Sequence, residues 1–269
     1  MNHAILGYLL LSFMGFVLGL LGGGGSILAV PILVYVIGLD AVKGTAYSLF
    51  LVGIGALVGG IRYAKRSKVH FPSVFVFGMP ALMGVFSVRK WLIPTLPEVI
   101  FSTDYLVLHK GTLIMVSFAI IMVLASFSMI RSSMRAQTES DEEHPPHYNY
   151  PLIFLEGIII GGITGFVGAG GGFLIVPALV LLARLPMKYA VGTSLFIIAI
   201  KSLIGFVGDM IEHSIDWGFL AVASALVIIG IFAGTYTAHF ISARRLKAIF
   251  GVFVLLMGAF IMLYEVYLK

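Results

Sequence analysis

Continuous apolar stretches, separated by short polar ones, run along almost the whole 269-residue chain. They lack the alternation of apolar and polar residues that marks the strands of a membrane barrel, so they predict helices. The pattern delimits ten helical segments. The first half of the chain contributes residues 4–21, 27–38, 44–61, 71–88 and 111–130. The second half contributes residues 151–167, 173–183, 190–210, 217–234 and 248–267.

Two of these segments, 27–38 and 173–183, are too short to cross a bilayer. An α-helix rises about 1.5 Å per residue and the hydrocarbon core is about 30 Å thick, so a crossing takes about 20 residues. We interpret both segments as half-length or broken helices. The first residues of the chain lack the basic region and cleavage site of a secretory signal, so the first segment is expected to remain in the mature protein.

The composition restricts the class of protein. Hydrophobic residues make up 60% of the chain and charged residues 11%, with a mean hydropathy of +1.09. A soluble domain carries about a quarter charged residues, so this composition excludes a soluble enzyme and predicts an all-α polytopic membrane protein. The absence of cysteine removes disulfides, thiolate nucleophiles and cysteine metal sites. The net charge of +5 is then explained by membrane topology rather than by nucleic-acid binding.

The basic residues also orient the predicted helices. If the basic cluster at residues 62–68 faces the cytoplasm and all ten segments cross, most of the other Lys and Arg residues fall inside as well. This orientation places both termini outside, together with Arg89 and Lys90. Lys201 lies near the middle of a predicted span. The alternative is that one short segment does not cross the membrane, which changes the number of crossings from even to odd.

One long polar stretch, residues 131–150, divides the chain near its midpoint. We therefore expect a first transmembrane repeat over 1–130, a cytoplasmic polar linker over 131–150 and a second transmembrane repeat over 151–269. His144 and His147 lie in this linker beside acidic residues and could hold a metal ion. A solvated connection interrupted by prolines is the simpler interpretation.

The two halves of the chain resemble each other. Residues 15–34 match residues 161–180 with a constant offset of 146. A second match, between the Gly-Thr steps that begin at Gly44 and Gly192, is displaced by 148. Because each half holds an odd number of predicted segments, the second copy enters the membrane from the opposite side. The pattern predicts two inverted repeats, a transporter design in which the substrate site lies where the repeats meet.

A run of glycines in each half falls between a full segment and a short one. Glycine costs about 1 kcal/mol against alanine inside a helix, so we interpret these runs as breaks. Broken backbone in a membrane is buried in protein or lines a wet cavity, and its free N–H groups with the helix dipole favour an anion. The candidate substrate-binding residues of the breaks are Gly22, Gly23, Gly24, Gly25, Ser26, Gly170, Gly171 and Gly172.

Close helix packing is the alternative use of glycine in a membrane. Gly15, Gly19, Gly161 and Gly165, which are spaced four residues apart in each half, fit that role. Packing alone rarely needs consecutive glycines, so we assign the contiguous runs to the substrate path instead.

The paired pattern G-x-x-x-G-x-x-G-x-G-G-G-x-x-x-V-P, which ends at Pro31 and Pro177, resembles the TauE/SafE sulfite exporter family, also called the toluene sulfonate uptake permease family. The resemblance covers essentially the whole chain. It implies a small carrier of the bacterial or archaeal inner membrane that moves sulfite, sulfonates, thiosulfate or related organic anions, often coupled to protons or another ion. Ser26 stands where the second copy has Gly172, so we expect the two half-sites to differ.

Ionisable and hydroxyl side chains inside the predicted spans are the remaining candidates. A lysine at midspan costs roughly 2.5–3.5 kcal/mol on insertion scales, so Lys201 should face a partner or an aqueous cavity. We interpret it as the counter-charge of a bound anion; a structural pair with Glu156, or snorkelling, is the alternative. Candidate hydroxyl donors, whose simpler role is to cap or bond the preceding turn, are Thr45, Ser48, Thr193 and Ser194. Glu156 and Asp209 are candidates for proton coupling, although an interfacial position without a transport role is favoured for Glu156 and a hydrated outer loop explains Asp209 equally well.

These features predict an alternating-access transporter of small anions, whose partners are the substrate and the lipid bilayer, with no cofactor, metal or nucleic acid. An uncoupled anion channel that uses the same broken helices is the first alternative. A membrane-embedded enzyme is disfavoured, because neither H-E-x-x-H nor G-x-S-x-G occurs and the seven histidines are scattered. Assembly into a homo-oligomer is left open.

Overall fold

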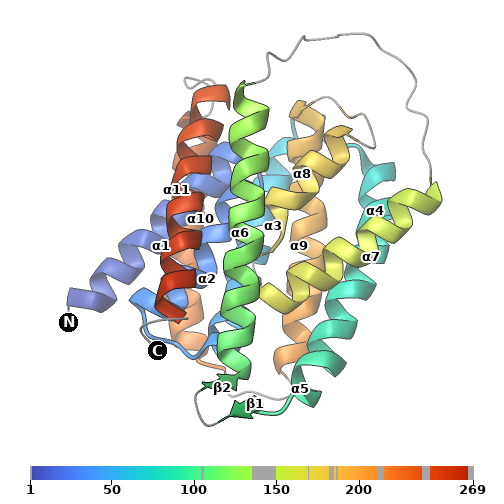
Figure 1. The fold of residues 1–269 in the computed structure, drawn as a ribbon. Helices are drawn as coiled ribbons and strands as arrows, with labels where there is room; N and C mark the ends of the chain where they lie inside the picture. Colours follow the sequence, from blue (N-terminus) through green and yellow to red (C-terminus); the bar gives the residue numbers. More distant parts are fainter. Residues whose placement is uncertain are drawn as a thin grey trace.

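The computed structural model describes residues 2–103, 106–134, 150–168, 170–181, 185, 187–210, 215–237 and 243–265. Within these ranges the protein is almost entirely helical, and its helices pack side by side in one bundle (Figure 1). In the part of the chain that the structure describes, five helices are long and apolar enough to cross a membrane, and shorter apolar helices accompany them. The predicted all-α polytopic membrane fold is confirmed.

The elements divide between the two halves of the chain. The helices of the first half are α1 (Asn2–Leu21), α2 (Ala29–Pro31), α3 (Ala41–Ala64), α4 (Phe71–Ser87), α5 (Ile93–Thr95) and α6 (Lys110–Met134). Between them lie the 3-10 helix η1 (Gly24–Leu28) and the π-helical turns η2 (Ile32–Val36) and η3 (Val88–Leu92). An antiparallel hairpin, β1 (Val99–Thr103) and β2 (Leu106–His109), precedes α6. The second half contains α7 (Tyr150–Val167), α8 (Gly172–Leu181), α9 (Met187–Met210), α10 (Trp217–Thr237) and α11 (Ala243–Leu263).

Each of the ten predicted segments corresponds to helical structure. The short segment 27–38 is not a regular helix but a succession of η1, α2 and η2. The segment predicted to end at Val88 is longer than expected, because η3 and α5 extend it to Thr95. The hairpin before α6 was not predicted. Residues 135–149 of the predicted linker, with His144 and His147, lie outside the described residues.

Helices of one half pack mainly against helices of the other. α1 lies along α10, and α7, the counterpart of α1 in the second half, lies along α4 (Figure 1). α3 packs on its own counterpart α9, and α6 packs on its counterpart α11. Two repeats related by a two-fold axis would exchange their contacts in this way, so the packing supports the predicted repeat.

Glycines make the exchanged contacts close. A Cβ on Gly19 would lie 2.6 Å from the carbonyl oxygen of Ile231 on α10, and Gly15 approaches the backbone of the same helix. Gly161 and Gly165 approach the backbone of α4 in the same manner. Helix backbones come this close only where no side chain intervenes, so the predicted packing role of these four glycines is confirmed.

Equivalent hydrogen bonds between the two halves are related by a single difference in residue number. The backbone N–H of His70 donates to Thr193 Oγ1 at 2.9 Å, and that of Asp216 donates to the Tyr47 hydroxyl at 2.7 Å. The donors are 146 residues apart, and so are the acceptors. The predicted change of offset to 148 at the Gly-Thr steps is therefore wrong, because packing between α3 and α9, rather than local sequence likeness, sets which positions are equivalent.

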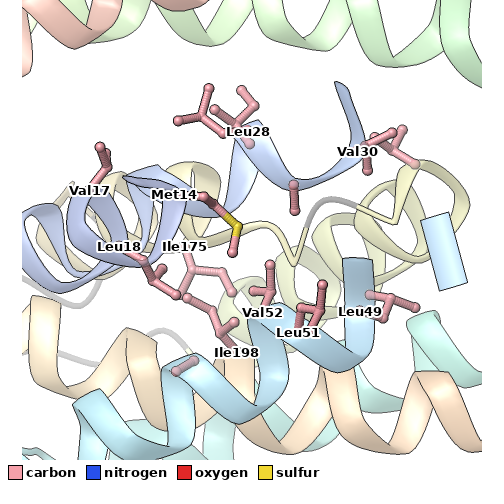
Figure 2. Close-up of a cluster of buried hydrophobic side chains, with 14 of the residues drawn as sticks. Met14, Val17, Leu18, Leu28, Val30, Leu49, Leu51, Val52, Ile175 and Ile198 are labelled. Carbon is pink, nitrogen blue, oxygen red and sulfur yellow. The ribbon is translucent and has the colours of Figure 1, made fainter. Parts of the chain in front are cut away.

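Buried apolar side chains from both halves meet at the centre of the bundle (Figure 2). Met14 and Leu18 of α1, Val52 of α3, Ile175 of α8 and Ile198 of α9 all belong to this cluster and have no exposed surface. Large apolar side chains also cover the outside, among them Leu9, Phe75, Leu124, Ile229 and Leu256. A lipid-facing surface has this character, because its neighbours are hydrocarbon chains rather than water.

Candidate functional site

The two glycine breaks meet inside the bundle. A Cβ on Gly23 would lie 2.7 Å from Cα of Gly172, so the two backbones touch with no side chain between them. Gly22 follows α1 with a φ of 77°, and Gly168 follows α7 with a φ of 74°. Such backbone angles suit glycine and disfavour other residues. The interpretation of the glycine runs as helix breaks is confirmed.

The two breaks differ in shape. The first turns directly into the 3-10 helix η1. In the second, Gly170 and Gly171 also have a positive φ (64° and 70°) before α8 begins at Gly172. Within the described residues, no acceptor pairs with the backbone N–H groups of residues 170–172. The second break therefore presents a row of backbone donors without a partner among the described residues, at the start of a ten-residue helix.

Lys201 of α9 lies beside the second break and is fully buried. Its Nζ donates a hydrogen bond of 2.5 Å to Oγ1 of Thr164 on α7. A Cβ on Gly171 would lie 2.8 Å from this Nζ, so the ammonium group faces the glycine backbone directly. Among the described residues Lys201 forms no ion pair. The alternative pair with Glu156 is absent, and Oε2 of Glu156 has no described hydrogen-bond partner.

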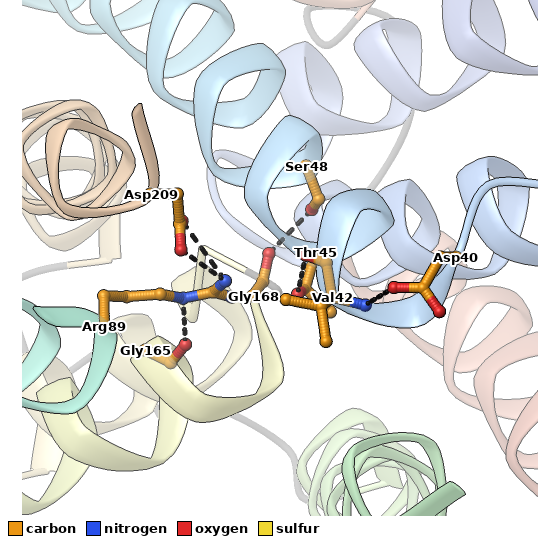
Figure 3. A network of polar contacts seen from close by, with 8 residues as sticks. All are labelled: Asp40, Val42, Thr45, Ser48, Arg89, Gly165, Gly168 and Asp209. Carbon is orange, nitrogen blue, oxygen red and sulfur yellow. Dashed lines mark hydrogen bonds and ion pairs between the residues drawn. The ribbon is translucent and has the colours of Figure 1, made fainter. Parts of the chain in front are cut away.

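Arg89 of η3 places a second buried cation at the other end of this break (Figure 3). Its Nε donates to the carbonyl oxygen of Gly165 at 2.5 Å, and its Nη1 lies 3.2 Å from Oδ2 of Asp209. Its Nη2 is buried and has no partner among the described residues. A Cβ on Gly168 would lie 2.7 Å from this Nη2, so the free amino group points at the start of the break.

The expected exposure of Arg89 to the aqueous phase is therefore wrong. The residue is 1% exposed, and its partner Asp209 is 3% exposed rather than part of a hydrated loop. The reason is that the helix does not end at Val88: η3 continues it and turns Arg89 toward α7 and α9. Lys90, the next residue, is exposed and lies over the ring of Trp91.

The predicted hydroxyl donors are already engaged with backbone. Ser48 Oγ donates to the carbonyl oxygen of Gly168 at 2.7 Å, across the two halves (Figure 3). Ser26, Thr45 and Ser194 each donate to a carbonyl three residues earlier in their own helix or turn. A hydroxyl carries a single hydrogen, so none of these groups is free to donate to an anion in this arrangement. The unused donors at the second break belong to the two cations and to the backbone.

Thr193 is separate from the breaks. Its Oγ1 accepts the backbone N–H of His70, in the connection between α3 and α4. It lies eight residues before Lys201 on the same helix, which corresponds to a rise of about 12 Å. The structure therefore does not bring Thr193 to the buried ammonium group.

Sequence reasoning missed Arg89 and Thr164. A comparison of the two copies contained a signal for Thr164, because the apolar Leu18 stands at the equivalent position in the first half. Arg89 was missed because it stands beside Lys90, and two adjacent cations at the end of an apolar run indicate a position at the membrane surface. Within the described part of the chain, no group of His, Cys, Asp or Glu residues is suited to hold a metal ion.

A bundle of apolar helices with two broken helices meeting at buried cations defines a polytopic integral membrane protein built as a transporter. Residues 8–261 match the family described as Sulfite exporter TauE/SafE. The chain belongs to this family and is a membrane transporter of the TauE/SafE type.

Two relatives illustrate the match. A protein named Probable membrane transporter protein from Xylella fastidiosa (strain 9a5c) is 30% identical over 256 residues, which cover 92% of this chain and 90% of that protein. Probable membrane transporter protein YunE of Bacillus subtilis (strain 168) is 29% identical over 239 residues, which cover 78% and 81%. No solved structure matches the chain. The relatives' names give no substrate, so the substrate has to be argued from the site.

Proposed function

We propose that this protein is a secondary transporter of small sulfur-containing or related organic anions, of the sulfite, sulfonate or thiosulfate class, and that the anion binds at the second glycine break. The observation that carries the proposal is Lys201, a buried cation without an acidic partner among the described residues, whose Nζ faces Gly171. The description of the family as a sulfite exporter supports the sulfur class.

The surroundings of Lys201 favour an anion. An ammonium group in a low-dielectric interior is costly unless an opposite charge or several acceptors satisfy it. The hydroxyl of Thr164 satisfies one of its three N–H groups. A transported anion would supply the missing charge, and the free backbone N–H groups of residues 170–172 would share it with the ammonium group.

Alternating access across the cytoplasmic membrane of a bacterium or archaeon, with both termini outside, is the proposed mode of transport. The exchanged helix pairs support it, because inverted repeats open to alternate sides by rocking one unit against the other around a fixed site. Glu156 stays a candidate for proton coupling, since its buried Oε2 lacks a described partner. Asp209 is the weaker candidate, because Arg89 holds its carboxylate.

Transport by the purified protein in proteoliposomes tests the proposal. Uptake of labelled sulfite, methanesulfonate or thiosulfate should saturate, show counterflow and, with coupling, respond to an imposed proton gradient. Lys201→Met should lower this uptake about 10- to 100-fold, because hydrogen bonds to charged groups contribute about 1.5–3 kcal/mol.

Lys90→Met is the matched control, since it removes an exposed cation from the same protein. It should leave uptake unchanged. Unchanged uptake in Lys201→Met would contradict the proposed site. Anion conductance without saturation or counterflow would contradict a carrier and indicate a channel instead.

A further inference from the structure

Arg89 lies at the break where the proposed function places the anion, and one of its amino groups is unused. The side chain is 1% exposed. Its Nη2 has no partner among the described residues and lies 2.7 Å from the position that a Cβ on Gly168 would occupy. Because Gly168 has no side chain, none separates Nη2 from the backbone of the break.

The remaining atoms of the guanidinium group explain why Nη2 points there. Nε donates to the carbonyl oxygen of Gly165 on α7, and Nη1 donates to both carboxylate oxygens of Asp209 on α9, at 3.3 and 3.2 Å (Figure 3). These partners come from two helices and fix the plane of the group. A buried charged donor without an acceptor is unfavourable, and an anion at the Gly168 end of the break would satisfy it.

We propose that Arg89 is a second contact for the transported anion, and that the buried charges of this site select a singly charged oxyanion. This inference rests on the proposed function. Lys201 faces Gly171 and Arg89 faces Gly168, so the two cations mark the ends of one short stretch of backbone. Three residues span at most about 11 Å, so both cations act on an anion anywhere along it.

The charge balance gives the selectivity. With Lys201 protonated, Lys201 and Arg89 carry two positive charges against the one negative charge of Asp209, so these three side chains together have a net charge of +1. A monoanion such as a sulfonate or hydrogensulfite neutralises it. A dianion such as sulfate leaves an excess negative charge in a low-dielectric interior, which is unfavourable.

Uptake of methanesulfonate and sulfate by the reconstituted protein tests this inference, because both are tetrahedral sulfur oxyanions that differ in charge. The wild type should take up methanesulfonate at least about tenfold faster than sulfate, the factor expected for one additional charge at this distance in a partly buried site. Arg89→Gln should raise the KM for methanesulfonate about 10- to 100-fold, and Arg89→Lys should raise it less.

Asp209→Asn separates a contact with the anion from a purely structural ion pair. It keeps an acceptor for Arg89 but adds one positive charge to the site, so the ratio of sulfate to methanesulfonate uptake should rise about tenfold. A structural pair would lower both rates together and leave the ratio unchanged. The double variant Arg89→Gln with Asp209→Asn avoids an unpaired buried carboxylate, and it should fold yet keep the raised KM. Lys90→Gln is the control and should change neither quantity.

The outcomes distinguish this inference from the proposed function. If the wild type transports these anions and Lys201→Met lowers uptake as expected, but the Arg89 and Asp209 variants leave the KM and the uptake ratio unchanged, then this inference alone is overturned. If the wild type transports none of the sulfur anions, the proposed function and this inference are overturned together.

Discussion

The two glycine breaks share one sequence pattern, yet three buried charged residues, Lys201, Arg89 and Asp209, lie at the second. At the offset of 146, the counterparts of Lys201 and Thr164 in the first half are Gly55 and Leu18. The same contact exists there in apolar form, because a Cβ on Gly55 would lie 3.1 Å from Cδ2 of Leu18. The two contacts are equivalent in position, but Lys201 and Thr164 make the one at the second break through polar groups, whereas Gly55 and Leu18 make the one at the first break through apolar atoms.

The beginnings of the breaks show the same contrast. The atoms nearest to a Cβ on Gly22 would belong to Val191, whereas those nearest to a Cβ on Gly168 would belong to Thr45 and to the guanidinium group of Arg89. The equivalent positions therefore keep their geometry and differ in chemistry. The comparison teaches that the two copies keep a similar backbone arrangement at their breaks, while buried charged side chains lie beside the second copy. We accordingly expect one anion for each transport cycle.

Gly171→Ala should have the largest effect, because it changes the charged break directly. The new Cβ would lie 2.8 Å from Lys201 Nζ and still closer to Thr164, at a φ of 70° that disfavours alanine. We expect a loss of about 1–3 kcal/mol in stability and more than a tenfold loss of uptake. Thermal unfolding in detergent and uptake in proteoliposomes measure the two effects.

Gly38→Ala is the matched control for Gly171→Ala. Gly38 has a φ of 83°, but nothing lies within 4 Å of its Cβ position, so alanine there adds backbone strain without a clash. It should lower stability by about 1–2 kcal/mol and keep uptake. If both variants lost uptake equally, strain rather than the contacts at the break would explain the loss.

Thr164→Val should have an intermediate effect. It keeps the shape of the side chain but removes the oxygen that accepts from Lys201 Nζ at 2.5 Å. We expect the KM of uptake to rise about fivefold, since a hydrogen bond contributes about 1 kcal/mol net. Leu18→Val shortens the equivalent side chain at the first break, where it should lower stability by about 1 kcal/mol through lost packing and leave the KM unchanged. Equal increases in KM would show that both breaks bind the anion.

The sequence predicted the features that depend on local chemistry. Run length gave the ten helical segments, and consecutive glycines gave the two breaks, because glycine is the residue that tolerates a φ near 70°. Lys201 was identified by the cost of a charge at midspan, which holds whatever surrounds it.

The features that the sequence did not reveal depend on contacts between distant residues. Arg89 is buried because a π-helical turn and Asp209, 120 residues away, hold it inside. Beside Lys90 at the end of an apolar run, it had the pattern of an interfacial residue. The hydroxyl of Ser48 was a plausible anion donor until its partner across the halves, Gly168, was known. Such pairings follow from the tertiary register, which no local pattern encodes.

Ser48→Ala and Ser194→Ala make the smallest expected changes and compare the halves at equivalent positions. Ser48 Oγ donates across the interface to the Gly168 carbonyl, whereas Ser194 Oγ donates to Val191 within its own helix. Thermal unfolding in detergent should show a loss of about 1–2 kcal/mol for Ser48→Ala, because a buried bond between the halves is removed. Ser194→Ala should change stability by less than about 0.5 kcal/mol, because the Val191 carbonyl keeps its helical position. Equal losses would mean that the second break is held no more firmly than the first, and the contrast between the breaks would then rest on the charges alone.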